Sequence, residues 1–163
     1  MKYIPLTQGK STVVDDEDYD RLSKHKWYCA YYGGKRRLPY AVRTIYTNGK
    51  RTIKMHREIM DAPESLVVDH INRDTLDNCK HNLRVCTSSE NLYNSTYKKP
   101  TERNPYKGVH LRRNGKFQAT IYYDGRLRTI GTFETALEAA KNRDEWTRKV
   151  QGVYGLVNIK DAV

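Results

Sequence analysis

The stretch VVDHINRDTLDNCKHNLRVCTSSENLYN, residues 67–94, decides how the fold is interpreted, because it joins two apolar segments by a polar loop. Residues 66–68 predict a strand, and a polar loop follows at 71–82. Residues 83–86 predict a second strand. A helix is expected over 88–97, since serine is a frequent N-cap residue. Strand, loop, strand and helix in this order can fold the helix back onto the two strands.

Four polar residues in this stretch suit a metal-assisted hydrolytic site. Asp69 offers a carboxylate ligand, and the adjacent His70 offers an imidazole whose ordinary pKa, near ~6.5, suits a general base at neutral pH. Asn82 follows twelve residues after His70, and Asn91 comes nine residues later on the predicted helix. Because carboxylate and amide oxygens are hard ligands, Asp69 and Asn91 favour one Mg²⁺ or Mn²⁺ ion. Taken singly, each residue also has an ordinary structural explanation, such as a loop histidine or a helix-cap asparagine.

The order and spacing of these residues resemble the HNH nuclease family in its H-N-N variant, whose site is a ββα-metal finger. The matching elements are Asp69-His70, N-L-R at 82–84 and S-E-N at 89–91. The resemblance implies a DNA endonuclease in which His70 is the general base and Asp69 and Asn91 hold one divalent ion. It also implies that Asn82 braces the loop of Asp69 and His70. For Arg84 two roles stay open, a contact with the scissile phosphate or an ion pair within the fold.

The three cysteines form no C-x-x-C pair, so neither a disulfide framework nor a zinc knuckle is predicted. A zinc site built from Cys79, His81, Cys86 and His70 is not expected either, because C-x-H followed by a cysteine five residues later lacks the paired spacing of structural zinc sites. No apolar stretch approaches membrane-spanning length, and the N-terminus lacks a signal-peptide core. We therefore expect no membrane partner and a cytoplasmic location, in a bacterial or phage-infected cell.

The charge is strongly basic, +11 overall with a pI near 9.6. Residues 1–97 hold 16 basic and 12 acidic side chains, net +4, whereas residues 98–163 hold 14 and 7, net +7. Such a surplus favours a polyanionic partner, and double-stranded DNA is the expected one. The C-terminal part carries the stronger positive field for its length.

The N-terminal part predicts a β-rich extension. Residues 11–28 indicate a short strand and a helix of two to three turns, with Asp15 to Asp18 placed at the positive end of the helix dipole. Residues 26–55 predict antiparallel strands interrupted by Gly33-Gly34 and Asn48-Gly49. A short helical turn is expected at 55–60, where the H-R pair resembles an element that precedes the finger in the HNH family. For His56 a structural or phosphate-binding role is expected.

Beyond the charged segment 97–105, three strands and a closing helix are predicted. The strands lie in KGVHLRR, GKFQATIYYDG and RLRTIGTF, and the helix spans 135–150. In the second strand Phe117, Ala119, Ile121 and Tyr123 share one face, which is expected to pack on the helix. The opposite, polar face is expected to enter the major groove of DNA. The candidate DNA-binding residues are His110, Arg112, Lys116, Gln118, Thr120, Tyr122, Arg126 and Arg128.

Residues 107–158 resemble the Apetala/ethylene-response-factor DNA-binding domain, through K-G-V at 107–109, G-K-F at 115–117, I-G-T-F at 130–133 and E-A-A at 138–140. Three positions depart from that pattern. Asn114 replaces a usual tryptophan, Thr129 replaces a DNA-facing aromatic residue, and Asn142-Arg143 replaces the usual Ala-Tyr of the helix. The target preference of the plant domains is therefore not transferred.

Together these patterns predict an α+β protein with three parts. A ββα-metal finger with its β-rich extension occupies 1–97, a linker 98–106, and a three-stranded antiparallel sheet packed on one helix 107–163. The expected function is that of a homing-type endonuclease that nicks or cuts DNA as a monomer or homodimer. The alternative is a non-catalytic, sequence-specific DNA-binding regulator on the same scaffold. An RNA-directed protein is a third reading, which Tyr122 and Tyr123 keep open although exposed stacking pairs are otherwise lacking.

Overall fold

The computed structural model describes residues 1–33, 37–47, 49–95, 100–101, 103 and 106–159. The chain divides into two compact units, unit 1 (Met1–Ser88) and unit 2 (Ser89–Val163). The described residues form four small antiparallel sheets together with four helices, which confirms the α+β class. None of these helices is long and apolar enough to cross a membrane.

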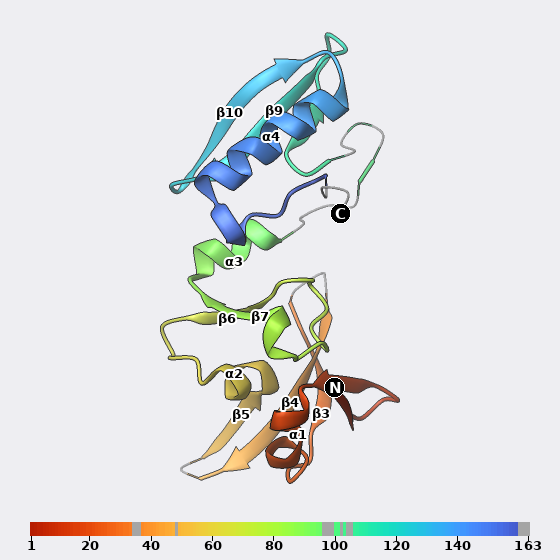
Figure 1. Ribbon diagram of the computed structural model, residues 1–163, viewed down its shortest axis with the longest axis vertical. Helices are drawn as coiled ribbons and strands as arrows, with labels where there is room; N and C mark the ends of the chain where they lie inside the picture. The colour runs from red at the N-terminus through yellow and green to blue at the C-terminus, as the bar shows by residue number, and fades with distance from the viewer. Residues whose placement is uncertain (34–36, 48, 96–99, 102, 104–105, 160–163) are drawn as a thin grey trace. The chain divides into compact units, whose positions relative to one another are not determined.

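Unit 1 contains most of the predicted elements and one hairpin that was not predicted. Its elements in chain order are β1 (Lys2–Pro5), β2 (Ser11–Val14), α1 (Asp16–Leu22), β3 (Tyr28–Tyr32), β4 (Leu38–Tyr46), β5 (Lys50–Lys54), α2 (Met55–Met60), β6 (Val67–His70), the 3-10 turn η1 (Lys80–Asn82) and β7 (Leu83–Cys86) (Figure 1). The strand order β3-β4-β5 confirms the antiparallel prediction for residues 26–55. Gly34 and Asn48, which belong to the two predicted turns, lie outside the described residues.

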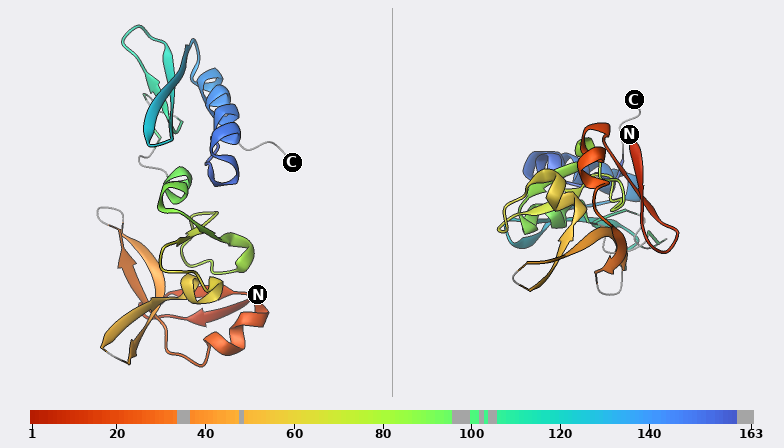
Figure 2. Two further views of the ribbon diagram at one scale, coloured as in Figure 1. Left: turned by 90° about the vertical axis from the view of Figure 1, so that its left-hand side faces the viewer. Right: turned by 90° about the horizontal axis from the view of Figure 1, so that it is seen from below.

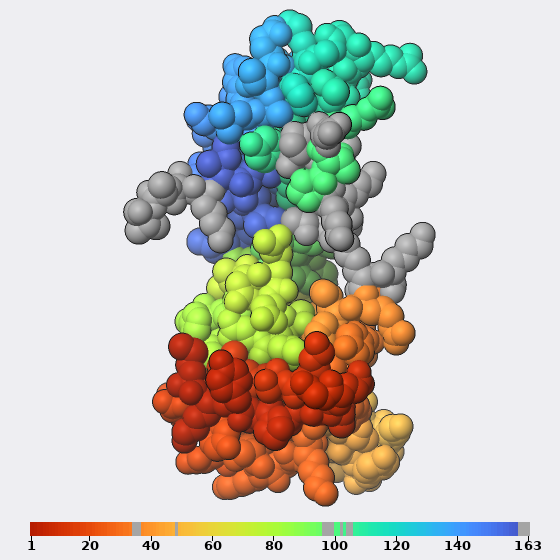
Figure 3. Space-filling model, turned by 90° about the vertical axis from the view of Figure 1, so that its right-hand side faces the viewer, coloured from red at the N-terminus to blue at the C-terminus, as the bar shows by residue number. Residues whose placement is uncertain are grey.

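The β1–β2 hairpin packs against the segment 67–86, which contains β6, the polar loop 71–82 and β7 and is called the finger segment below. Val13 bridges to residues 76–78, because its amide donates to the Leu76 carbonyl (3.0 Å) and its carbonyl accepts from the Asn78 amide (2.9 Å). The Thr12 hydroxyl donates to the same Leu76 carbonyl at 2.7 Å. In Figure 3 the N-terminal residues form one continuous surface with the finger segment. The extension therefore supports the polar loop 71–82 directly.

One hydrophobic core holds the elements of unit 1 together. Val14, Leu22 and Met55 are completely buried in it, and burial of each such side chain contributes about 1.5–3 kcal/mol. Trp27 is also buried and donates from its indole nitrogen to the Leu22 carbonyl at 2.8 Å. The core joins β1, β2, α1, β3, β4, α2, β6 and β7 into one body. The two strands of the finger are thus fixed to the N-terminal extension by packing.

The hairpin of β6 and β7 places the Asp-His pair differently from expectation. The predicted strand covered residues 66–68, with Asp69 and His70 at its end, before the polar loop 71–82. In the structure β6 continues through both residues, and Asp69 pairs with Arg84 and His70 with Leu83 across the hairpin. Because side chains alternate along a strand, Asp69 and His70 lie on opposite faces of it. Pairing with β7 therefore extends the strand through the polar residues Asp69 and His70.

Unit 2 contains α3 (Ser88–Asn94, beginning at the last residue of unit 1), β8 (Val109–Leu111), β9 (Phe117–Tyr123), β10 (Arg126–Phe133), α4 (Ala136–Val150) and the 3-10 turn η2 (Gly152–Tyr154). The strand order is β10-β9-β8, and α4 packs along one side of this sheet (Figure 2). The predicted three-stranded sheet on one helix is confirmed. Thr135 caps α4 by accepting from the Glu138 amide at 3.1 Å. Most of the predicted linker 98–106 lies outside the described residues, and the predicted domain boundaries stay predictions.

Two buried charges tie the end of unit 2 to α4. Asp144 accepts from the backbone amides of Asn158 and Ile159 at 2.8–2.9 Å. Arg143 donates to the Leu156 carbonyl at 3.0 Å. Gly108 allows β8 to approach this core, since a Cβ there would lie 2.4 Å from the Thr120 carbonyl oxygen and its φ is +71°. Arg143, which departs from the Apetala pattern, is accordingly a structural residue.

A bulge in β10 reverses part of the predicted DNA-facing surface. The register pairs Arg126 with Tyr123 and Arg128 with Ile121, and it shifts by one residue between Thr129 and Gly131. Paired residues of antiparallel strands point to the same side. Arg126 and Arg128 therefore share the side of Ala119, on which α4 packs, and the prediction that they face the opposite side is wrong. Arg128 instead lies over the Tyr123 ring at 5.6 Å and pairs with Asp124.

The side facing away from α4 keeps most of its other predicted members. His110 pairs with Gln118 across β8 and β9, and Tyr122 on the same side is 47% exposed. Thr120 shares this side as predicted but is buried, with its hydroxyl bonded to the Gly108 carbonyl, and its DNA contact stays a prediction. Arg112 is exposed but follows the end of β8. Lys116, another candidate DNA-binding residue, precedes β9 and pairs with Glu134.

Candidate active site

His70 is held by a chain of hydrogen bonds that reaches back to the N-terminal hairpin. Its Nε2 lies 3.2 Å from Oδ1 of Asn78, and Nδ2 of Asn78 donates to the Thr12 hydroxyl at 2.7 Å. His70 and Asn78 are both buried. Asn78 was not predicted to belong to the site. Its partner Thr12 is 66 residues away in sequence, and no local signal separates Asn78 from its neighbours Asn72 and Asn82.

This chain also fixes the tautomer of the imidazole. The Thr12 hydroxyl gives its single proton to the Leu76 carbonyl, so it accepts from Asn78 and the amide nitrogen of Asn78 faces it. The amide oxygen then faces His70, and an oxygen acceptor requires a proton on Nε2. In the neutral ring the lone pair is therefore on Nδ1. Burial lowers the pKa of His70, although the Asn78 hydrogen bond and Asp69 act in the opposite direction, so the ring is a neutral base near pH 7.

Asp69 forms an ion pair with Arg84 across the hairpin. Arg84 donates to Oδ2 of Asp69 from Nε at 2.9 Å and from a terminal nitrogen at 2.6 Å. The two side chains are only 8% and 14% exposed. Of the two roles left open for Arg84, the structure shows the ion pair within the fold. The guanidinium orients the carboxylate and balances its charge in a partly dehydrated setting.

Asn82 fastens the two ends of the polar loop. Its side-chain oxygen accepts from the Asn72 amide at 2.9 Å, and its side-chain nitrogen donates to the Asp77 carbonyl at 2.8 Å. Its own carbonyl accepts from the Ile71 amide. These contacts brace the loop that follows Asp69 and His70, in the way that the family resemblance implies. The side chain that touches the imidazole itself is Asn78.

Two further rings surround His70. The ring of His56 on α2 lies 5.0 Å from that of His70, and the ring of Tyr40 on β4 lies 6.1 Å from it. Burial lowers the pKa of His56 to about 2, with smaller effects of His70 and Lys54. His56 is thus a neutral packing partner of His70. Its neighbour Arg57 is structural, because it donates to the carbonyls of Ala62, Pro63 and Leu66 at 2.7–3.0 Å.

The predicted metal ligands fall in different units. Asp69 lies in unit 1, and Asn91 lies on α3 in unit 2. The pairing of Asp69 with Asn91 therefore stays a prediction. Asp69 by itself fits a hard divalent cation, since a carboxylate offers the oxygen ligands that such ions prefer.

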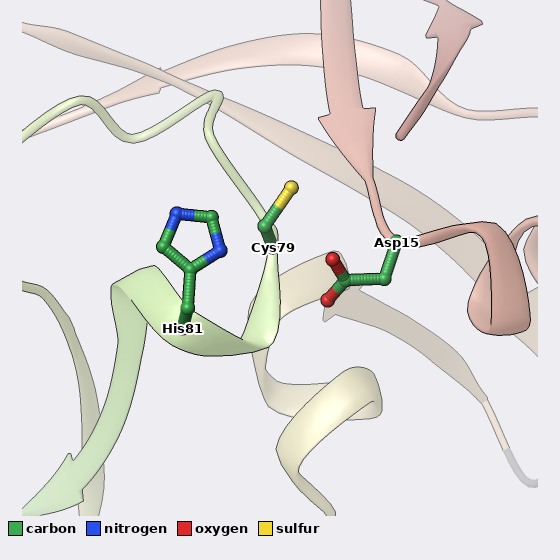
Figure 4. Close-up of side chains that lie close together, drawn as sticks. All are labelled: Asp15, Cys79 and His81. Atoms are coloured by element: carbon green, nitrogen blue, oxygen red, sulfur yellow. The ribbon is translucent and has the colours of Figure 1, made fainter.

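Another group of possible metal ligands lies at the junction of β2 and η1. The ligand atoms of Asp15, Cys79 and His81 lie within 4.8 Å of one another (Figure 4). Oδ2 of Asp15 accepts from the Lys80 amide at 2.7 Å, so this carboxylate caps η1. Burial and the nearby Asp15 and Asp77 raise the pKa of the Cys79 thiol to about 12. These contacts account for Asp15 and Cys79 as structural residues, and Cys86 and His70, on β7 and β6, are not among the three grouped residues.

Comparison with known proteins finds one family whose model matches the segment that contains the site. Residues 61–93 match the family model described as HNH endonuclease. Over 162 residues the chain is 27% identical to a protein named as an uncharacterised HNH endonuclease of Acanthamoeba polyphaga mimivirus, and the match covers 94% of this chain and 78% of that protein. No solved structure gives a significant match. The family match contains Asp69, His70, Asn78, Asn82 and Arg84.

Proposed function

Because this chain is an HNH endonuclease and hence a phosphodiester hydrolase, we propose that it cleaves double-stranded DNA at the Asp69–His70 site with one Mg²⁺ or Mn²⁺ ion. The observation that carries the proposal is the Thr12–Asn78–His70 chain, which holds a neutral, buried imidazole in the residue that follows Asp69. The family implies a divalent ion, and the choice of Mg²⁺ or Mn²⁺ follows from the oxygen ligands.

In this proposal Nδ1 of His70 removes a proton from the attacking water. The resulting hydroxide attacks phosphorus, the bond to the 3′ oxygen breaks, and the leaving oxygen takes a proton from solvent water to become a hydroxyl group. The protonated His70 then returns its proton to solvent. Asn78 keeps the proton on Nε2 and so keeps Nδ1 basic. Asp69, oriented by Arg84, and Asn91 would hold the ion, which supplies Lewis-acid stabilisation of the leaving oxygen.

Unit 2 is proposed to hold the duplex through the side of its sheet that faces away from α4. That side carries His110, Gln118 and Tyr122, and the exposed Arg112 and Lys116 lie at its edge. The resemblance to the Apetala/ethylene-response-factor domain and the net charge of +7 over 98–163 support this assignment. With one site per chain, nicking by a monomer is the simplest mode, and cutting both strands requires a homodimer or two events. A homing-type role fits this design.

The first test is metal-dependent cleavage. Purified protein is expected to convert supercoiled plasmid to nicked or linear DNA with Mg²⁺ or Mn²⁺, and EDTA is expected to abolish the reaction. Gel electrophoresis of the plasmid forms measures it. Cleavage that persists in EDTA would contradict the metal assignment. Duplex binding without cleavage under any of these conditions would favour the DNA-binding regulator.

A pair of adjacent tyrosines tests the DNA-binding side of the sheet. Tyr122 lies on the side away from α4 and Tyr123 on the side of α4, and they are 47% and 37% exposed. Tyr122→Ala is expected to weaken duplex binding about 3–10-fold, the equivalent of one lost hydrogen bond. Tyr123→Ala is expected to bind like wild type. Fluorescence anisotropy with a labelled duplex measures both, and equal losses would mean that this side of the sheet does not contact DNA.

A further inference from the structure

Lys54 lies at the edge of the ring cluster that surrounds His70. It is the last residue of β5, directly before α2, and it is half-buried. Its ammonium lies 4.6 Å from the centroid of the Tyr32 ring and 5.0 Å from that of Tyr40. The Tyr32 and Tyr40 rings meet edge to face at 5.8 Å. Two aromatic rings therefore hold the ammonium on the side of the site formed by β3, β4 and β5.

Tyr40 connects this ammonium to the catalytic pair. Its ring is 6.1 Å from that of His70 and 5.5 Å from that of His56. Burial raises the pKa of Tyr40, and the Asp69 carboxylate raises it further. Tyr40 thus contacts both the Lys54 ammonium and the His70 ring, and all three residues belong to unit 1.

The positive charge of Lys54 lacks a carboxylate partner within the described part of the chain. Other half-exposed lysines near acids are paired, as Lys80 is with Glu17 and Asp18. Burial and the nearby Arg57 lower the pKa of Lys54, which reflects a charge without compensation. Ring faces attract a cation but accept none of its three N–H bonds in the manner of an oxygen. An anionic oxygen beside Tyr40 would complete its coordination.

We propose that Lys54 is a catalytic residue that binds a non-bridging oxygen of the scissile phosphate, with Tyr32 and Tyr40 holding its ammonium in place. This assignment rests on the proposed nuclease function of the Asp69–His70 site. Charge builds up on those oxygens as hydroxide attacks phosphorus, and a fixed cation there stabilises the transition state. Lys54 comes from outside the matched segment 61–93, so the N-terminal extension contributes to the chemistry as well as to support.

Single-turnover cleavage and duplex binding separate this role from a general DNA contact. The rate constant is measured with excess enzyme on supercoiled plasmid in Mn²⁺, and the Kd is measured with a random duplex in EDTA. Lys54→Met is expected to slow cleavage about 10–100-fold, as loss of one fixed donor to the transition state does, with the Kd almost unchanged. Lys54→Arg is expected to recover part of the rate, because it keeps the cation.

Lys2 provides the matched control, since its ammonium lies 4.7 Å from the Tyr19 ring centroid in the same unit. Lys2→Met is expected to cleave like wild type. Lys54→Gln repeats the test if Lys54→Met melts below the assay temperature. A weaker Kd with an unchanged saturating rate would overturn the proposal in favour of a distant phosphate contact, as would wild-type behaviour in both assays. A wild-type protein that never cleaves would remove the proposed function first, and the phosphate role of Lys54 with it.

Discussion

Replacing His70 with alanine is expected to slow DNA cleavage about 10²–10⁴-fold, the contribution of a positioned general base. The reason is geometric. Nε2 of His70 is bonded to Asn78, so Nδ1 carries the lone pair, and no other described imidazole has this combination of burial, tautomer and neighbouring carboxylate. Plasmid nicking at saturating enzyme measures the rate, and anisotropy with a labelled duplex measures affinity, which is expected to change little.

His25 supplies the control for this experiment, because it is an exposed histidine in the same unit. His25→Ala is expected to cleave like wild type. If His70→Ala lost affinity and rate in the same proportion, His70 would be a structural residue, and the base would have to be sought elsewhere in the site.

The second large effect concerns stability. Arg84→Ala is expected to destabilise unit 1 by about 3–5 kcal/mol, because it leaves the carboxylate of Asp69 buried without its cation. Arg51→Ala removes an ion pair with Glu64 whose side chains are 67% and 87% exposed, and it is expected to cost at most about 1 kcal/mol. The two variants thus delete the same kind of pair at different depths.

Urea unfolding followed by Trp27 fluorescence measures both variants, in a Trp146→Phe background that leaves the buried tryptophan of unit 1 as the reporter. Equal losses for Arg84→Ala and Arg51→Ala would show that water reaches Asp69 in the folded state. In that case the carboxylate would not depend on Arg84 for its orientation.

Much of the candidate site could be predicted from the sequence because its key residues are adjacent or nearly so. Asp69 and His70 are neighbours in one strand, and Arg84 opposite Asp69 belongs to the next strand. A hairpin brings such residues together whatever surrounds it. Asn82 could also be placed, since its partners Asn72 and Asp77 lie within ten residues of it.

The remaining parts of the site come from distant segments and could not be predicted. Thr12 and Asn78 meet only because β2 docks on the loop 71–82. Tyr40 and His56 reach His70 only because β4 and α2 share its core, and Lys54 of β5 reaches the site only through Tyr40. Such contacts depend on packing over long sequence separations, and no local pattern records them. The β1 strand was missed for the same reason, as its pairing with β2 is what gives it structure.

In the sheet of unit 2 the sequence determines some features, and only the tertiary structure decides others. Alternation in the sequence determined that β9 has an apolar side and a polar side, that Asp124-Gly125 turns the chain, and that Thr135 begins a helix. It also determined that Arg126 and Arg128 share a side. Only the tertiary structure decided which side, because the one-residue bulge between Thr129 and Gly131 turns the first half of β10 over relative to its second half. A shift of one residue in a strand moves every side chain to the other face, and the packing of Ile130 and Phe133 against α4 fixes where that shift occurs.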